Sequence, residues 1–428
     1  MSPATATPEE IDDIAELNIV DDLDNRPSKK TEWGRQLEIE IIDDEEALNP
    51  DPYDFVYSNI PTSSNMLEKE EDCRFCHATK FKYETKGLCC KKGQIRLANT
   101  VTPPELMRLW TSNDSDARHF RQNIRFFNGH FSFTTLYCQL DKDTTDMRTA
   151  GIYTFRAHGQ IYHNIQSFGD SDSEPKHLQL YFYDDDPSLE HRYRYCRDEI
   201  YEQDKHVIGI ITDILRGNPY SQQFRSLGQA ENLEDYRLIL NLDQRLDQRR
   251  YNEPINSEVA AVWIEGNERR DTYDRNIILH GNNNEKELIR SYYGCYDPLS
   301  YPLFFPRAEL GWHRKIPKRE TREEDIGAEN ITNDDDPDSS NGLWVTMREY
   351  YCYKFHTRPS IFNPILHGGR LFQQFAVDTY IKIESSRLDY MWHNQNKIRA
   401  DLYQGLLDCI QAGEQNGDAV GKQRVLAS

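Results

Sequence analysis

The sequence predicts an α+β protein in which an acidic tail precedes a cysteine-rich element, an antiparallel-sheet central domain and a helical C-terminal segment. Three observations carry this prediction. Four cysteines cluster between residues 73 and 90, β-branched and aromatic residues alternate through 130–185, and apolar residues recur at helical spacing after residue 367. At 428 residues, the chain has room for two or three domains.

The composition limits the classes of protein to which the chain can belong. Hydrophobic residues make up 37%, charged residues 29%, and the formal net charge is -21, so a core forms beside sizeable disordered parts. Such an acidic chain is no general nucleic-acid coat, although local basic surfaces remain open to it. We expect no membrane association and an intracellular protein, because no apolar run of about 18 residues and no signal-peptide core occur.

Residues 1–65 are predicted to be a disordered acidic tail. The clusters IDDIAEL, DDLDN and IIDDEEALNPD repel themselves and contain no aromatic residue to bury. The motif DEEALNPDPYDF could dock on a protein partner, and a solvated linker is the alternative that this composition favours.

Residues 66–100 contain the pattern that points most directly to a cofactor. Cys73 and Cys76 form a C-x2-C knuckle, and Cys89 and Cys90 return after a turn at Gly87. Thiolates at this spacing can surround one tetrahedral zinc ion, so we predict a structural, zinc-knuckle-like element. The fourth ligand stays open between Cys90 and His77, because adjacent cysteines are an unusual pair. Reduced, partly buried thiols are the alternative to a metal site.

Basic residues near this element predict weak, salt-sensitive DNA binding. Lys91, Lys92 and Arg96 follow the cysteines. Further on, Arg118, Arg121 and Arg125 share one face of an expected helix that ends at Gly129. Ordinary surface charge is the alternative for the first three, and a solvated edge on a core-packing helix is the favoured alternative for the arginines.

The central domain is expected over 101–316. Prolines at its start suit the first turn of a helix. Residues 189–232 are expected to form helices with a break at Asn218-Pro219. The segment YDPLSYPLFFPRAELGWH is expected to pack in the core. His158 and His163 are predicted to be core or hairpin histidines rather than ligands. Strands are expected in HFSFTTLYCQL, GIYTFRAHGQIYHNI, HLQLYFYD, YRLILNL, AAVWIEG and RNIILHG.

An acidic linker is expected over 317–345, and the helical segment over 346–428. The strings GRLFQQFAVDTYIKIESSRL, NQNKIRADLYQGLLD and VGKQRVLAS closely resemble the opening of the helicase-like N-terminal module of Helitron transposases. GIYTFRAHGQIYHNIQSF, KHLQLYFYD and the cysteine string resemble other elements of that family. The resemblance implies a nuclear protein of rolling-circle DNA transposition with a zinc-finger-like element; without it, a cytoplasmic location is the alternative.

The catalytic motifs of that family are missing from the printed chain. No His-x-His pair occurs, Tyr350 and Lys354 are expected to make only a contact within a helix, and the loop from Gly417 to Gln423 departs from a phosphate-binding loop. Because Val420 to Leu426 turns strand-like and the family's module continues further, we expect a non-catalytic front portion truncated before the nuclease and helicase domains. The alternatives are a host protein-interaction module derived from a transposon, without DNA binding, and an enzyme with a spatially assembled metal site.

Overall fold

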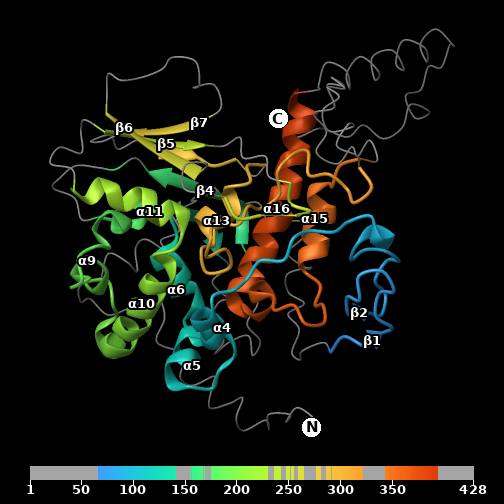
Figure 1. Ribbon diagram of the computed structural model, residues 1–428, viewed down its shortest axis with the longest axis horizontal. Helices are drawn as coiled ribbons and strands as arrows, with labels where there is room; N and C mark the ends of the chain where they lie inside the picture. The colour runs from blue at the N-terminus through green and yellow to red at the C-terminus, as the bar shows by residue number, and fades with distance from the viewer. Residues whose placement is uncertain are drawn as a thin grey trace, which may run out of the picture.

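The computed structural model of the protein is shown in Figure 1. It describes residues 66–140, 155, 157–166, 168, 175–229, 236–241, 247–250, 252–254, 259–264, 276–280, 286–290, 292–321 and 343–393. The predicted tail over 1–65, most of the predicted linker, the predicted strand at 420–426 and the loop at 417–423 lie outside these residues.

The cysteine-rich element is small and built from short pieces. Its two strands, β1 (Lys69–Glu70) and β2 (Lys80–Phe81), pair antiparallel, and η1 (Lys91–Gly93) follows the second pair of cysteines. The expected turn at Gly87 is present, with φ at 86°, a backbone conformation that glycine adopts without strain. With so few backbone pairs, the element depends on its cysteine cluster and on its neighbours for stability.

Three helices follow, and they differ in part from the prediction. α4 (Pro104–Thr111) begins at a proline as expected. The single helix expected through the arginine row is two helices, α5 (Ser115–Gln122) and α6 (Ile124–Phe131), broken at Asn123 with φ -111° and ψ 29°. The predicted end at Gly129 is wrong, because the helix continues to the fully buried Phe131. Burying that ring outweighs the cost of about 1 kcal/mol for glycine inside a helix.

Two small antiparallel sheets confirm the predicted α+β class. The first has the order β3-β4-β8, built from β3 (Thr135–Leu140), β4 (Ala157–Gln166) and β8 (Lys286–Leu288). The second has the order β6-β5-β7, built from β5 (Tyr236–Asn241), β6 (Ala260–Ile264) and β7 (Asn276–His280). In the first sheet Thr135 pairs with Asn164, and the register shifts between Tyr137 and Gln139.

One segment expected as a strand is helical. Residues His177–Tyr183 form the 3-10 helix η2, in which Leu180, Tyr181 and Phe182 are buried one after another. A strand with one solvated face would bury only alternate residues, so a tight helix inside the core suits three consecutive apolar side chains better. The hydroxyl of Tyr181 donates to the carbonyl of Phe131 at 2.5 Å, which ties η2 to α6.

The helical part expected over 189–232 is present but interrupted. The break at Asn218-Pro219 is confirmed, because the Asn218 side chain accepts from the amide of Tyr220 at 2.9 Å and starts the next helix. In chain order, the elements are α9 (Glu190–Tyr193), η3 (Asp198–Ile200), α10 (Tyr201–Leu215), α11 (Pro219–Arg225) and η4 (Ser226–Gln229).

The last described elements enter the same core as the rest. They are α13 (Tyr296–Ser300), α15 (Met347–Lys354), η7 (Pro364–His367) and α16 (Arg370–His393). The aromatic run through Phe305 is buried as expected, and one hydrophobic cluster extends from Cys73 to Phe375. In Figure 1, α15 and α16 lie between the cysteine-rich element and the sheets. The cysteine-rich element, the central domain and the helical segment therefore share a core, while their exact boundaries stay predictions.

None of the helices in the described ranges has the length and apolarity that a membrane span needs.

Candidate metal centre and basic face

The four predicted cysteine ligands come together in space. Their sulfur atoms all lie within 4.8 Å of one another. The Sγ atoms are 3.7 Å apart for Cys73 and Cys90, 3.7 Å for Cys76 and Cys89, and 3.9 Å for Cys89 and Cys90. A zinc ion with Zn–S bonds of about 2.3 Å places tetrahedral sulfurs about 3.8 Å apart, so these thiols fit the geometry of zinc. The cluster contains Cys90 and not His77, whose side chain is exposed.

The backbone explains how two adjacent cysteines face one point. Cys90 has φ -158° and ψ 14°, and the next two residues, Lys91 and Lys92, adopt left-handed conformations with φ of 46° and 56°. This tight path turns the chain around the Cys90 sulfur, which accepts a hydrogen bond from the amide of Gly93 at 3.2 Å. At the first pair, the amide of His77 donates to the carbonyl of Cys73 at 2.7 Å and closes the knuckle.

The pKa values of the thiols shift in different directions. Burial raises the pKa of the Cys90 thiol to about 12 and also raises the pKa of Cys89 well above its usual value. Burial acts in the same direction on Cys73, but hydrogen bonds from the amides of Phe75 and Cys76 outweigh it and lower its pKa to about 7. A divalent metal would replace the protons on all four sulfurs, because thiolates are the metal-binding form.

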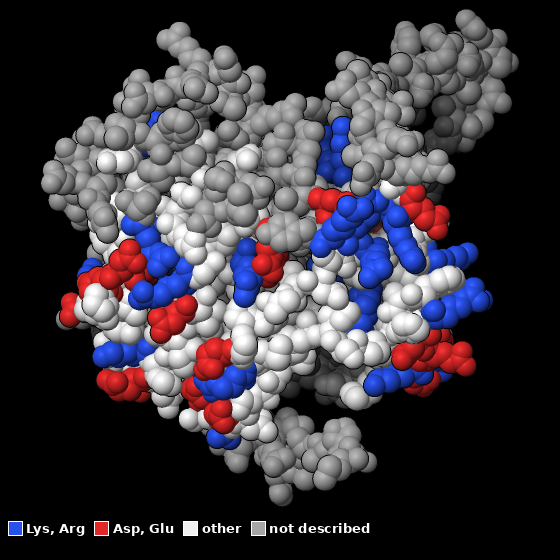
Figure 2. Space-filling view, in the orientation of Figure 1, with Lys and Arg blue, Asp and Glu red and all other residues white. Residues whose placement is uncertain are grey.

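The first predicted basic group lies beside this cluster. Lys91, Lys92 and Arg96 are exposed, and the chain after them runs between two distant segments. The amide of Arg319 donates to the carbonyl of Gln94 at 2.8 Å, and the amide of Ala98 donates to that of Gln248 at 2.7 Å. Figure 2 shows lysine and arginine side chains gathered over α15, α16 and the neighbouring cysteine-rich element. We call the exposed residues Lys91, Lys92, Arg96, Arg250, Arg319 and Arg348 the basic face.

Three members of the basic face were not expected from the sequence. Arg250 belongs to a charged connection that reads as a solvated turn, Arg319 lies within the predicted acidic linker, and Arg348 follows it. The long-range pairing of residues 94–98 with 248 and 319, and the ion pair of Lys91 with Glu349, bring them together. The face also contains an acid, since Glu349 forms ion pairs with Lys91 and, at 3.7 Å, with Lys318.

The second predicted basic group lies elsewhere and has other partners. In Figure 1, α5 lies at the lower edge of the molecule, away from β1 and β2. Arg121 donates from Nη1 to the carbonyl of Leu109 at 2.8 Å, and Arg125 donates from Nε to Oε1 of Gln374 at 2.9 Å. Arg118 is exposed. The structure therefore separates the six predicted residues into an exposed group of three and a row in which two arginines hold the fold together.

The predicted core histidine is confirmed, and it belongs to a buried polar network. His163 is 2% exposed, and its Nε2 lies 3.1 Å from Oδ2 of Asp378 on α16. The hydroxyls of Tyr296 and Tyr301 donate to the same carboxylate at 2.7 Å each. Burial acts to raise the pKa of Asp378, but the charge and hydrogen bond of His163 and the tyrosine hydroxyl outweigh it and hold the pKa below its usual value. The network fixes α16 against β4 and α13. The side chain of His158 lies outside the description.

A second part of the network fixes α15. Lys382 donates to Oδ1 of Asp297 at 2.6 Å and contacts the Tyr351 hydroxyl, which lies 2.7 Å from the other oxygen of that carboxylate. The expected contact of Tyr350 with Lys354 is also present, with the ammonium 5.7 Å from the ring centroid. Tyr350 is buried and donates to the carbonyl of Leu310 at 2.9 Å, so its role in the structure is packing.

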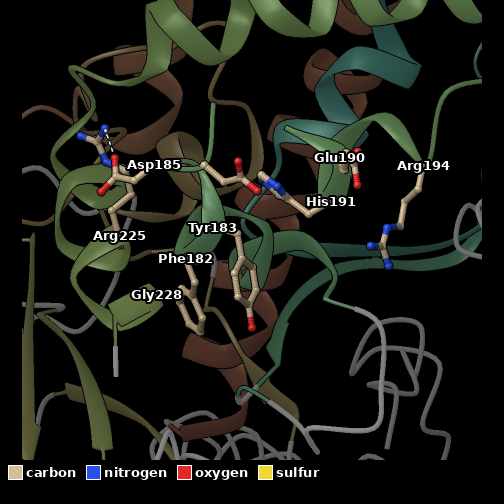
Figure 3. A pocket seen from close by; sticks show the side chains of 9 residues that line it. Phe182, Tyr183, Asp185, Glu190, His191, Arg194, Arg225 and Gly228 are labelled. Atoms are coloured by element: carbon tan, nitrogen blue, oxygen red, sulfur yellow. Dashed lines mark hydrogen bonds and ion pairs between the residues drawn. The ribbon is translucent and has the colours of Figure 1, made fainter. Parts of the chain in front are cut away.

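A surface pocket of about 290 Å³ lies between η2, α9 and α11 (Figure 3). Arg225 points toward Asp185, with an N–O distance of 3.4 Å, and His191 lies 3.0 Å from Oδ1 of Asp184. Because these groups are engaged within the protein, the pocket offers a ligand few strong partners and supports no assignment.

The fold and the cysteine cluster define an α+β protein with a candidate tetrathiolate metal centre. A family model described as the Helitron helicase-like domain at N-terminus matches residues 350–428. The resemblance seen in the sequence is confirmed over these residues, where the chain is similar to the Helitron helicase-like domain. The match starts in α15 and takes in α16, the two helices that the buried network fixes. No curated protein matches the chain.

Proposed function

We propose that this chain is the non-catalytic, DNA-contacting part of a Helitron-type transposition protein, acting in the nucleus, with a zinc ion holding its contact element together. The observation that carries the proposal is the position of the cysteine cluster. Its sulfurs have zinc-like spacing, and the exposed Lys92 and Arg96 follow them directly in the chain. The same element contacts α15 through the ion pair of Lys91 with Glu349, and the family match begins in that helix.

Zinc, when bound, supplies a cross-link between two loops that share little apolar core. The protein's own residues do the rest. The Cys73 and Cys76 knuckle and the Cys89 and Cys90 turn hold the two loops in place, and the left-handed turn presents Lys92 outward. The side chains of the basic face then neutralise phosphates of the nucleic-acid backbone.

The charge of the whole chain sets the strength of this contact. With a formal net charge of -21, long-range repulsion opposes DNA binding, so only a local surface can hold phosphates. Each neutralised phosphate contributes a slope of about -0.9 to the dependence of log affinity on log salt. Two to four phosphate contacts give binding that is clear in low salt and marginal near physiological ionic strength.

The proposal includes no nicking and no ATP hydrolysis by this chain. The sequence contains no His-x-His pair for a divalent ion and no G-x4-G-K-[ST] loop for phosphates. The reactions of a Helitron-type transposition would therefore depend on residues other than those printed here.

Two measurements test the proposal together. Elemental analysis of protein purified without chelator should give about one zinc per chain. A salt titration on single- and double-stranded DNA should show salt-sensitive binding, and removal of residues 1–65 should strengthen it by removing negative charge. Protein without zinc would refute the metal centre. Failure of both forms to bind at low salt would refute the DNA contact and favour a protein-interaction module that uses the acidic tail.

A further inference from the structure

Arg358 is a buried cation beside the cysteine cluster. Its side chain is 9% exposed, and its guanidinium carbon lies 3.6 Å from the ring centroid of Tyr353. Nη1 donates to the carbonyls of Tyr353 and His356 at 2.8 and 3.2 Å. These contacts hold the guanidinium in one place directly after α15, in the segment that matches the family model.

The other end of the guanidinium faces the cysteines. Nη2 donates to the carbonyl of Cys89 at 3.1 Å and lies 3.9 Å from Sγ of Cys76. Every contact found for Arg358 is to a carbonyl, a ring or a sulfur, and in the described part of the chain no carboxylate lies within ion-pair distance of it. Burying a charge without a counter-charge costs free energy, so we expect a negative charge beside Arg358 other than a carboxylate.

Four thiolates around one divalent ion supply that compensation. The thiolates outnumber the charges of the ion, so the loaded cluster is anionic, whereas four protonated thiols are neutral. We propose that Arg358 supports the metal centre from outside the coordination sphere, by donating toward its sulfur ligands. Metal loading thereby stabilises the contact between the cysteine-rich element, α15 and the Helitron-like segment. This inference rests on the zinc site of the proposed function and adds a positioning residue and a consequence of loading.

Further contacts join the cysteine-rich element to α15 and the residues after it, and metal loading would stabilise them too. The amide of Thr79 donates to the carbonyl of Thr357 at 2.9 Å, and Nε2 of His356 lies 3.1 Å from Oε2 of Glu84. On the other side of the element, Lys91 pairs with Glu349, the residue whose side chain also completes the capping box of α15. Loss of the anionic cluster would leave the buried Arg358 without a counter-charge at the centre of this interface.

The test compares Arg358→Met with Arg314→Met in the full chain. Arg314 is a matched control, because its guanidinium also stacks over a tyrosine, 5.3 Å from the centroid of Tyr292, but it is exposed and outside the cysteine cluster. Zinc affinity is measured by competition with a chelator. We expect Arg358→Met to weaken it about 10–100-fold, the size of effect known for residues that support metal ligands, and Arg314→Met to leave it unchanged.

Two further readouts separate positioning from misfolding. The cobalt-substituted protein should keep the absorption spectrum of a four-sulfur site in Arg358→Met, because all four ligands remain. Amide hydrogen exchange over 347–358 should slow on metal loading in the wild type, and this metal-dependent difference should shrink in the variant. Arg358→Lys, which keeps the charge but loses the planar stack, should fall between the two and serves if the methionine variant does not fold.

The outcomes distinguish the two proposals. A wild-type chain that binds no zinc overturns the proposed function itself. A wild-type chain that binds zinc, with Arg358→Met equal to it in affinity and in metal-dependent exchange, overturns only the role of Arg358.

Discussion

The two groups of basic residues in this protein show how alike patterns lead to opposite uses. Near the cysteines, Lys92 and Arg96 extend from a tight turn and an extended segment and are exposed. On α5 and α6, Arg121 and Arg125 are partly buried and bonded to groups from other elements. The residue types are similar, so the difference in exposure comes from whether neighbouring elements offer hydrogen-bond acceptors to the side chains.

The helical row has a structural task because of where its helices pack. The carbonyl of Leu109 is in the last turn of α4, where helix carbonyls have no partner of their own, and Arg121 supplies a donor. α5 is further fixed to α10, since Nε2 of His119 lies 2.8 Å from Oδ1 of the fully buried Asp204. In the turn after Cys90, Lys91 pairs with Glu349, while Lys92 is exposed and forms no ion pair with the described residues. A basic row on a core-packing helix is therefore weaker evidence for DNA binding than basic residues at a turn.

The largest effect is expected from removing a metal ligand. Structural zinc contributes on the order of 10 kcal/mol to small elements of this kind, so Cys90→Ser should lose the ion and loosen residues 70–100. Hydrogen exchange should rise there and stay unchanged in α5 and α6, and zinc content should fall to background. His77→Ala is the matched control for the fourth ligand and should keep its zinc. Zinc retained by Cys90→Ser, or lost by His77→Ala, would contradict the assignment.

A smaller but still large effect is expected from the basic face. Replacing Lys91, Lys92 and Arg96 by glutamate removes up to three phosphate contacts, which should reduce the salt slope by about 2.7 and weaken binding at low salt on the order of 100-fold. The control replaces by glutamate Arg194, Lys205 and Arg216, which lie in or directly after α9 and α10, away from β1 and β2 in Figure 1, and it makes the same change in net charge. Equal losses in both variants would show that net charge, rather than the face, governs binding.

Sequence reasoning predicts the local parts of this site and misses the long-range ones. The C-x2-C spacing identifies Cys73 and Cys76, and apolar spacing predicts a helix where the structure describes α16 over Arg370–His393. It cannot place Arg319 beside Gln94 or Arg358 beside Cys89, because those contacts depend on chain closure over long separations. The same limit explains η2, where burial among neighbours from α6 and α11 overrides a strand-like composition.

A third prediction concerns stability rather than binding. Arg121→Met should lower the free energy of unfolding by about 1–3 kcal/mol, because it leaves the carbonyl of Leu109 without its donor next to a buried side chain. DNA affinity should stay within twofold of wild type. Urea unfolding measures the first quantity, and a low-salt binding curve measures the second. Weaker DNA binding without a loss of stability would place Arg121 on the contact surface and remove the distinction between the two groups.

The smallest effect is expected at Arg118, the one exposed arginine of the helical row. Its substitution by glutamate should change stability by no more than about 0.5 kcal/mol, since exposed side chains away from buried networks are tolerant. A direct phosphate contact would change the slope of log affinity against log salt by about 0.9 or more. A charge that acts only through the general field leaves the slope nearly unchanged and fades above about 0.1 M salt, where the screening length is about 10 Å. A titration of Arg118→Glu from low to physiological salt therefore decides whether the contact surface ends at the cysteine-rich element, as we expect, or extends onto α5.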